Sequence, residues 1–322
     1  VDVNGSTAQT PCSTGTWQNQ TGQNSCTNAS AGHYVGTNGS TAQIPCDAGT
    51  WNNLTGQAAC MNASAGYYVD TNGSTSQTPC DAGTYNPSNG SNSSADCGDV
   101  PAGSFSGPGA SAPTPCSIGT WQDQVGQSSC MNASVGHYVD TNGSTSQTPC
   151  GLGTWNNMTG QAACTPASPG YYVDTNGSTT QTPCDAGTYN PNSSSNSSTD
   201  CLDTPAGNFS GPGAPSPTQC NPGTWQNQTG QSSCIEASPG HYASGYGNTN
   251  ETACGLGTWT GQSGQSSCTP ASPGYYVDTN GSTTQTPCGL GTYNPNSGSS
   301  DPSDCVQASP GYYVDQEGQS SQ

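Results

Sequence analysis

A glycine followed two positions later by an aromatic side chain recurs at short, nearly regular intervals along this sequence. The first such pairs are Gly15 with Trp17, Gly32 with Tyr34, and Gly49 with Trp51. We count 18 of these units, and they continue to the pair of Gly311 with Tyr313. Such a recurrence of one short motif predicts a repeat architecture, in which each unit contacts mainly its neighbours.

Within each unit the pattern predicts a small β-hairpin. Tyr171-Tyr172-Val173 favours a strand, and Asp174-Thr175-Asn176-Gly177 is a turn signal. Ser178-Thr179-Thr180 is then expected to return as the second strand. The glycine before each aromatic, such as Gly49 or Gly83, is expected in a backbone conformation closed to other residues. Abundant Gly, Pro, Asn, Ser and Thr argue against helices.

The 18 cysteines follow this repeat and also show a longer period of 104 residues, as Cys12, Cys116 and Cys220 illustrate. They divide the chain into a block at 1–115 with a partial unit at 1–11, a second block at 116–219, and a third at 220–322. Half of the units open and close with cysteine ("stapled" units), and the other half have neither ("unstapled" units). Because the two cysteines are present or absent together, we expect nine bridges between sequential cysteines. Pairing across an unstapled unit, such as Cys26 with Cys46, stays open as the alternative. The cysteines are Cys12, Cys26, Cys46, Cys60, Cys80, Cys97, Cys116, Cys130, Cys150, Cys164, Cys184, Cys201, Cys220, Cys234, Cys254, Cys268, Cys288 and Cys305.

The composition leaves little material for a hydrophobic core. Val, Leu, Ile and Phe together supply 22 of the 322 residues, a proportion that normally predicts disorder. A disulfide that closes a loop of 15 residues contributes about 3 kcal/mol in the chain-entropy model, so nine of them can hold an otherwise coreless chain. We therefore expect a small disulfide-rich β fold, with tandem hairpin repeats forming an extended rod or solenoid, no helices and a minimal hydrophobic core.

The charge of the chain excludes several classes of partner. It has no Lys or Arg against 19 Asp and Glu, a formal net charge of −19. Nucleic acids and anionic membranes need cations on the protein, so we expect no nucleic acid partner and no direct membrane contact. Cysteines without paired zinc-type spacing indicate an oxidising, extracellular compartment. The sequence shows no membrane-spanning run or signal peptide, and it starts within a repeat, as expected of a stretch of a longer protein.

One motif resembles a known family. Cys46-Asp47-Ala48-Gly49-Thr50-Trp51, closed by Cys60, is similar to the cysteine-rich repeat of ephrin-type receptors and to the first submodule of tumour-necrosis-factor-receptor repeats. The resemblance covers nearly the whole chain and implies rods of disulfide-bonded hairpins with a first-to-second bridge. This chain departs from the family by the absence of cysteines from alternate units. Similar repeats also occur in surface fibre glycoproteins of protists and algae.

Sequons for N-glycosylation are the most informative functional signal. Asn-x-Ser/Thr with x other than Pro occurs at 19 places, and many of these follow the repeat at the turn, after the tryptophan or before an opening alanine. We expect covalent N-glycans and no other cofactor, although the Ser/Thr-Pro segment at 111–115 could carry O-glycans too. The sequon residues are Asn4, Asn19, Asn28, Asn38, Asn53, Asn62, Asn72, Asn89, Asn92, Asn132, Asn142, Asn157, Asn176, Asn192, Asn196, Asn208, Asn227, Asn250 and Asn280.

Other chemistry is weakly signalled. His33, His137 and His241 occupy a position that holds Tyr in other copies, which indicates a packing or surface role and not catalysis. Asp70-Thr71-Asn72-Gly73-Ser74 lacks the acidic ligands of a calcium loop and is expected to be a plain turn. The six tryptophans are expected to cover disulfides; a sugar-stacking stripe is the alternative.

These features together lead to a functional expectation. We expect a non-enzymatic structural component of an extracellular, glycosylated filament or flagellar-hair-like appendage, with copies of the same chain as partners. The alternative is the stalk or ligand-binding ectodomain of a cell-surface receptor or adhesin.

Overall fold

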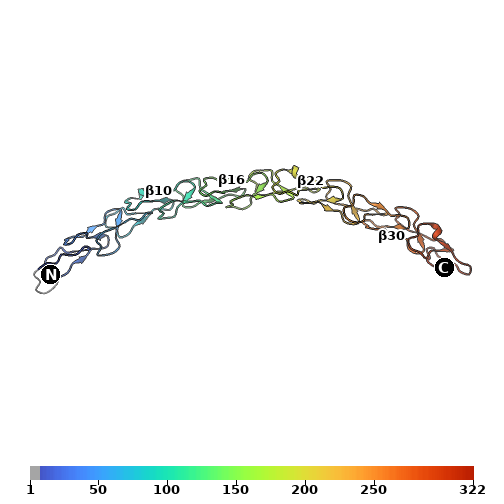
Figure 1. The fold of residues 1–322 in the computed structure, drawn as a ribbon, viewed down its shortest axis with the longest axis horizontal. Coiled ribbons are helices and arrows are strands. Elements are labelled where there is room, and N and C mark those ends of the chain that lie inside the picture. The colour runs from blue at the N-terminus through green and yellow to red at the C-terminus, as the bar shows by residue number, and fades with distance from the viewer. Residues whose placement is uncertain (1–7) are drawn as a thin grey trace. The chain divides into compact units, whose positions relative to one another are not determined.

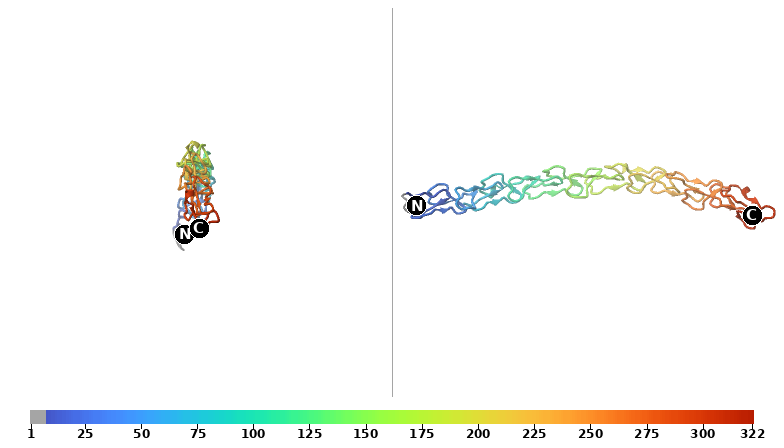
Figure 2. Two further views of the ribbon diagram at one scale, coloured as in Figure 1. Left: turned by 90° about the vertical axis from the view of Figure 1, so that its right-hand side faces the viewer. Right: turned by 60° about the horizontal axis from the view of Figure 1, so that its bottom comes forward.

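The computed structural model describes residues 8–322, so the sequon residue Asn4 lies outside the described part. Over this range the chain forms two-stranded antiparallel hairpins and three short 3-10 segments, with no α-helix (Figure 1). Contacts divide the chain into two compact parts, one of Val1–Cys150 with Asn156–Cys164 and one of Gly151–Trp155 with Thr165–Gln322. Within each part the hairpins follow one another in chain order (Figure 2). The expected small disulfide-rich β fold of tandem hairpins is confirmed.

The first part contains eight hairpins in its described residues. They are β1 (Thr16–Trp17) with β2 (Thr27–Asn28), β3 (His33–Tyr34) with β4 (Ile44–Pro45), β5 (Thr50–Trp51) with β6 (Met61–Asn62), β7 (Tyr67–Tyr68) with β8 (Thr78–Pro79), β9 (Thr84–Tyr85) with β10 (Gly98–Asp99), β11 (Ser104–Phe105) with β12 (Thr114–Pro115), β13 (Thr120–Trp121) with β14 (Met131–Asn132), and β15 (His137–Tyr138) with β16 (Thr148–Pro149).

The second part contains nine more. They are β17 (Thr154–Trp155) with β18 (Thr165–Pro166), β19 (Tyr171–Tyr172) with β20 (Thr182–Pro183), β21 (Thr188–Tyr189) with β22 (Leu202–Asp203), β23 (Asn208–Phe209) with β24 (Thr218–Gln219), β25 (Thr224–Trp225) with β26 (Ile235–Glu236), β27 (His241–Tyr242) with β28 (Thr252–Ala253), β29 (Thr258–Trp259) with β30 (Thr269–Pro270), β31 (Tyr275–Tyr276) with β32 (Thr286–Pro287), and β33 (Thr292–Tyr293) with β34 (Val306–Gln307).

The expected position of the second strand was wrong. β19 pairs with β20, so Tyr172 lies opposite Thr182, and Ser178–Thr180 belongs to the connection. A two-residue type I′ hairpin turn needs positive φ at both central residues, but at the Asn176-Gly177 turn only the glycine has positive φ (73°). The turn therefore does not close the hairpin. The backbone of Val173 bonds to other units instead, with its N–H donating to the Ser195 carbonyl at 2.9 Å.

Adjacent units are joined by backbone hydrogen bonds that recur in register. From the unit that opens at Cys46, Gly49 N–H donates to the Val69 carbonyl (2.7 Å) and Asn52 N–H donates to the Ser74 carbonyl (3.1 Å). In return, Gly73 N–H donates to the Cys46 carbonyl (2.7 Å). Within each part the units are therefore joined by main-chain hydrogen bonds, which depend little on side-chain identity.

Contacts also reach the second neighbour, beyond the adjacent units with which each unit was expected mainly to make contact. Gly49 has φ of +89°, and a Cβ placed on it would overlap the carbonyl oxygen of Gly90, two units further on. The same close approach joins Gly15 to Gly56 and Gly223 to Gly264. The conformation expected for these glycines is confirmed, and close backbone approach is a second reason why glycine is required there.

The core of each part consists of small residues. The residue that opens a unit is buried in nearly all units, as Cys46 (0% exposed) and Ala63 (0%) illustrate. The residue six positions later is buried in most units too; it is Val in most unstapled units, such as Val69, and polar in stapled units, such as Asn52. The amide of Asn52 is satisfied, since it donates to the His33 carbonyl and accepts from Leu54 N–H. Most of the aromatic residues are half-buried around this core, whereas Tyr246, Tyr312 and Tyr313 are exposed.

Within residues 8–322 there is no helix long and apolar enough to cross a membrane.

Candidate functional site

The disulfides lie within single units throughout the described chain. They join Cys12–Cys26, Cys46–Cys60, Cys80–Cys97, Cys116–Cys130, Cys150–Cys164, Cys184–Cys201, Cys220–Cys234, Cys254–Cys268 and Cys288–Cys305. All 18 cysteines are paired, and the cross-unit pairing of Cys26 with Cys46 does not occur. Each bridge ties the buried start of a unit to the residue just before its second strand.

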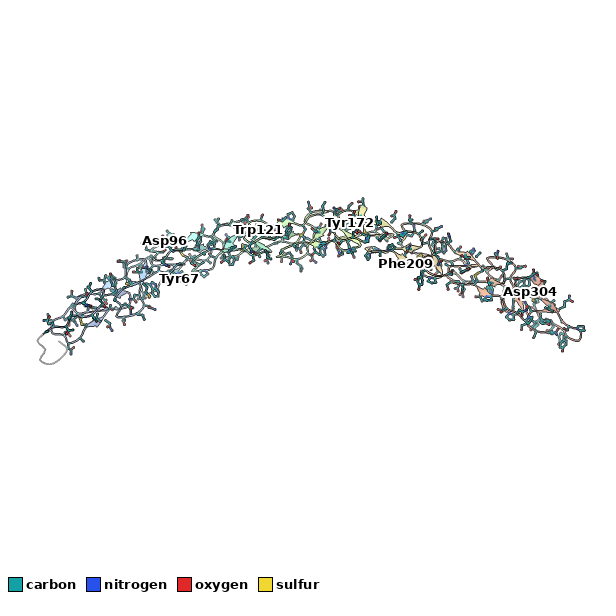
Figure 3. All side chains as sticks on the ribbon, viewed as in Figure 1. Tyr67, Asp96, Trp121, Tyr172, Phe209 and Asp304 are labelled. Atoms are coloured by element: carbon teal, nitrogen blue, oxygen red, sulfur yellow. A yellow bond between two sulfur atoms is a disulfide. The ribbon has the colours of Figure 1, made fainter. Side chains whose placement is uncertain are left out.

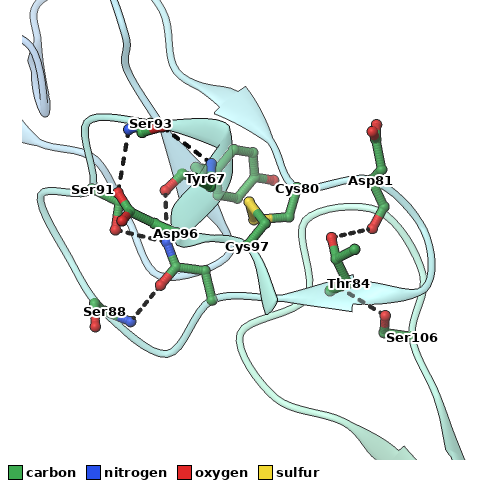
Figure 4. The surroundings of a disulfide bond; sticks show 12 residues. Tyr67, Cys80, Asp81, Thr84, Ser88, Ser91, Ser93, Asp96, Cys97 and Ser106 are labelled. Carbon is green, nitrogen blue, oxygen red and sulfur yellow. Dashed lines mark hydrogen bonds between the residues drawn. A yellow bond between two sulfur atoms is a disulfide. The ribbon is translucent and has the colours of Figure 1, made fainter. Parts of the chain in front are cut away.

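Three of the nine disulfides close loops that are three residues longer, and a 3-10 segment takes up the extra length. These segments are η1 (Ser94–Asp96), η2 (Ser198–Asp200) and η3 (Pro302–Asp304). In η1 the Ser93 hydroxyl accepts from Ala95 N–H at 3.1 Å, and the Asp96 carboxylate accepts from Ser93 N–H at 3.2 Å, a reciprocal capping box (Figure 4). These segments were not predicted, although Ser-x-x-Asp before η1 and η2 is a capping signal in the sequence.

The buried amide of Asn86 braces the same loop. Its Nδ2 donates to the Ser91 hydroxyl at 2.7 Å, and its Oδ1 accepts from Ser88 N–H at 3.0 Å (Figure 4). Asn190 and Asn294 repeat the contact with Ser195 and Ser299 at 2.7 Å. The hollow beside Asn86 is open and lined by polar side chains of this loop. These side chains already hydrogen-bond to one another and stabilise the loop itself.

The sequon asparagines lie on the surface. Of those within residues 8–322, only Asn208 is half-buried, and the others are exposed. Four at the turn accept a hydrogen bond from the preceding unit through Oδ1. The donors are Thr14 N–H to Asn38 (3.0 Å), Ala48 N–H to Asn72 (2.8 Å), Ala65 N–H to Asn89 (2.8 Å) and Ile118 N–H to Asn142 (3.0 Å). Reasoning from the sequence missed this second role.

Other candidate residues are spread along the chain and are not gathered into one site. The labelled aromatics Tyr67, Trp121 and Phe209 come from three separate hairpins (Figure 3). The three histidines occupy equivalent positions of the three blocks, each with Nδ1 3.2–3.4 Å from the carbonyl two positions earlier. Residues 8–322 hold no group of three His, Cys, Asp or Glu side chains arranged to bind a metal ion. Each histidine therefore has a local structural contact.

The tryptophans are half-buried, and their indole nitrogens are shielded from solvent without a hydrogen-bond partner in the described residues. A sugar-stacking site normally presents a ring face to solvent together with polar groups around it. The covered indole N–H groups instead fit the packing role expected from the sequence. Opposite Trp121 on the paired strand lies Met131, which is 41% exposed and extends the apolar surface of the hairpin.

Comparison with known proteins gives one family. Residues 103–150 match the family described as tyrosine-protein kinase ephrin type A/B receptor-like. No curated protein matches the chain. The matched segment includes the Cys116–Cys130 bridge and ends at Cys150, and the same bridge geometry recurs in the other stapled units. The disulfides and this match together indicate an extracellular, ectodomain-type protein. The match and the repeated disulfide pairs thus support ephrin-receptor-like cysteine-rich repeats in this chain.

Proposed function

We propose that the chain is a structural component of an extracellular, glycosylated filament or hair-like appendage. The observation that carries this proposal is the repeated register of backbone hydrogen bonds between units, together with the glycine contact to the second neighbour. Because these hydrogen bonds join main-chain atoms, each further unit can be added through the same contacts, without a new interface. Heterologous contacts of this kind, repeated from unit to unit, produce an open-ended assembly and not a closed ring.

The chemistry of the surface supports a structural role. The chain has no basic Lys or Arg side chain, and its acidic residues are dispersed along the repeats. Uniform negative charge keeps such a chain soluble and separate from nucleic acids and anionic lipids. We propose that its partners are copies of the same chain, that it has no catalytic activity, and that N-glycans are its only attached groups. Exposed apolar residues such as Met131 offer sites for lateral packing between chains.

A second candidate is the stalk or ligand-binding ectodomain of a cell-surface receptor or adhesin. The match of residues 103–150 to the ephrin-receptor-like family favours it. The two candidates differ in what surrounds the repeats, since a receptor adds a membrane anchor and a head domain, whereas a fibre consists of the repeats alone.

Electron microscopy of native material, followed by peptide mapping of the protein in each structure, distinguishes the candidates. The filament proposal expects long uniform fibres whose main protein is this repeat. Short rods attached to a membrane or to a head domain would reject it in favour of the receptor stalk.

A further inference from the structure

Burial separates the asparagines of the chain into two groups. Those that are buried are Asn52, Asn86, Asn156, Asn190 and Asn294. None of the five is in a sequon, and in Asn86-Pro87-Ser88 the proline at the middle position removes the sequon that would otherwise exist. The described sequon asparagines are exposed, with Asn208 half-buried. The fold therefore uses one group of amides internally and leaves the other group on the surface.

At the turns the two ends of the amide have separate roles. Oδ1 of Asn72 accepts from Ala48 N–H of the preceding unit at 2.8 Å, while its Nδ2 makes no hydrogen bond within residues 8–322. The backbone of the following residue is also fixed, since Gly73 N–H donates to the Cys46 carbonyl at 2.7 Å. Asn38 and Asn142 have the same arrangement. The oxygen thus holds the stack and the nitrogen stays available to solvent.

We propose that the turn asparagines Asn38, Asn72 and Asn142 carry N-glycans on Nδ2 while Oδ1 keeps its hydrogen bond to the preceding unit. The inference rests on the proposed extracellular function and names the sites of its glycosylation. In the transfer, Nδ2 forms a bond to the anomeric carbon of a lipid-diphosphate-linked oligosaccharide, the lipid diphosphate leaves, and Nδ2 loses one proton. The product is still an amide, so its carbonyl oxygen remains an acceptor.

The turns that carry these asparagines belong to unstapled units, which open at Ala29, Ala63 and Ala133. A glycan there extends from a residue that is fixed by the preceding, stapled unit. The stapled unit that opens at Cys46 separates the units of Asn38 and Asn72, so the glycans at these two turns belong to alternate units of the repeat.

Asn208 provides the contrast within the same chain. It lies in β23, and its Nδ2 donates to the carbonyls of Ala206 (3.1 Å) and Pro205 (3.4 Å). A glycan on this nitrogen would replace one of its two protons and displace at least one of those contacts at a half-buried position. Asn208 is therefore inferred to be unmodified although its sequon, Asn208-Phe209-Ser210, is intact.

Occupancy is tested on the full chain secreted from a eukaryotic host. Because trypsin has no Lys or Arg to cleave after, chymotrypsin and an Asp-specific protease supply the peptides. Enzymatic release of the glycans in ¹⁸O water marks each occupied asparagine for mass spectrometry. We expect label at Asn38, Asn72 and Asn142 and none at Asn208. Unlabelled turns, or Asn208 labelled as fully as the turns, would overturn the proposal. Filament formation is scored separately by electron microscopy, so failure here is distinguishable from failure of the proposed function.

The dual role of the amide is tested with three variants. Asn72→Asp removes the glycan and keeps an acceptor oxygen, Asn72→Ala removes both, and Ser74→Thr keeps the sequon and the hydroxyl as a control. Loss of one hydrogen bond predicts roughly threefold to tenfold faster hydrogen exchange at Ala48 N–H in Asn72→Ala. The other two variants are expected to match the parent at that amide. Equal exchange in the alanine variant and the parent would refute the structural role of Oδ1.

Discussion

Replacing Gly257 by alanine tests whether contact with the second neighbour stabilises the repeat. Gly257 has φ of +77°, and a Cβ there would overlap the Gly298 carbonyl oxygen and lie 3.1 Å from its carbon. Gly245, also inside the chain, provides the control, because it has φ of +76° and a Cβ on it would meet nothing within 4 Å. Both substitutions place alanine at positive φ, and the one at Gly257 also meets the backbone of another unit.

The expected magnitudes follow from that difference. An alanine at positive φ costs about 1–2 kcal/mol at either site. At Gly257 the backbone of the second neighbour must also move, which adds about 1–3 kcal/mol, the usual cost of overpacking. Gly255→Ala serves as a further control, because Gly255 has no positive φ and no atom within 4 Å of its Cβ position. It is expected to change stability by less than about 0.5 kcal/mol.

Hydrogen exchange followed by mass spectrometry is the suitable assay, because repeat proteins open locally and a single unfolding midpoint would average over the chain. The Gly257 variant should exchange roughly 5- to 150-fold faster around Gly257 and Gly298 than the Gly245 variant does around its own site. Equal effects at Gly257 and Gly245 would refute a stabilising role for the glycine contact and leave the positive φ as the whole cause.

Three further predictions use the same assay or a titration. Removing the bridge with Cys80→Ala and Cys97→Ala together should lower the local opening free energy by about 3 kcal/mol and affect units up to two positions away; loss of protection along the whole chain would contradict this. The Ser303 N–H that donates to Asp301 lowers the pKa of that carboxyl, so the cap contributes stability at neutral pH that is lost as the pH falls through the lowered pKa. Asp301→Ser, which copies Ser93, should reduce the pH dependence of η3 opening, and an unchanged pH dependence would contradict this. The unit at 237–253 has neither a disulfide nor a buried valine, because Ala243 stands in the valine position. Its backbone amides should exchange hydrogen faster than those of the unit at 271–287, and equal protection would count against the valine's contribution.

The sequence predicted the features that depend on one unit. Positive φ at Gly49, the existence of a hairpin in each unit and the absence of α-helix in the described residues all follow from local residue preferences. The second strand was misplaced because Asn-Gly was interpreted as the hairpin turn. In the structure the loop carries this dipeptide to the preceding unit, where Gly73 N–H reaches the Cys46 carbonyl.

Features that depend on two or three units were not predicted, although one of them left a signal. A second glycine recurs in most units, as Gly56 and Gly73 illustrate, and it also has positive φ. Its constant separation from an earlier glycine, the same from Gly15 to Gly56 as from Gly32 to Gly73, marks the close approach of two backbones. The hydrogen bond from Ala48 N–H to Asn72 has no such signal, because Asn-Gly-Ser is explained equally well as a turn and as a sequon.

The alternation of stapled and unstapled units has an energetic basis in the buried position six residues after the start of each unit. Stapled units place a polar residue there, such as Asn52, and the disulfide contributes about 3 kcal/mol to the closure of the loop. Most unstapled units place valine there, and burial of Val69 contributes about 1.5–3 kcal/mol. The two contributions are of similar size, so alternate units can lack cysteines without losing order. Because the buried valine of an unstapled unit also accepts a hydrogen bond from the stapled unit before it, Gly49 N–H to the Val69 carbonyl, the order of each unstapled unit depends on its stapled neighbour.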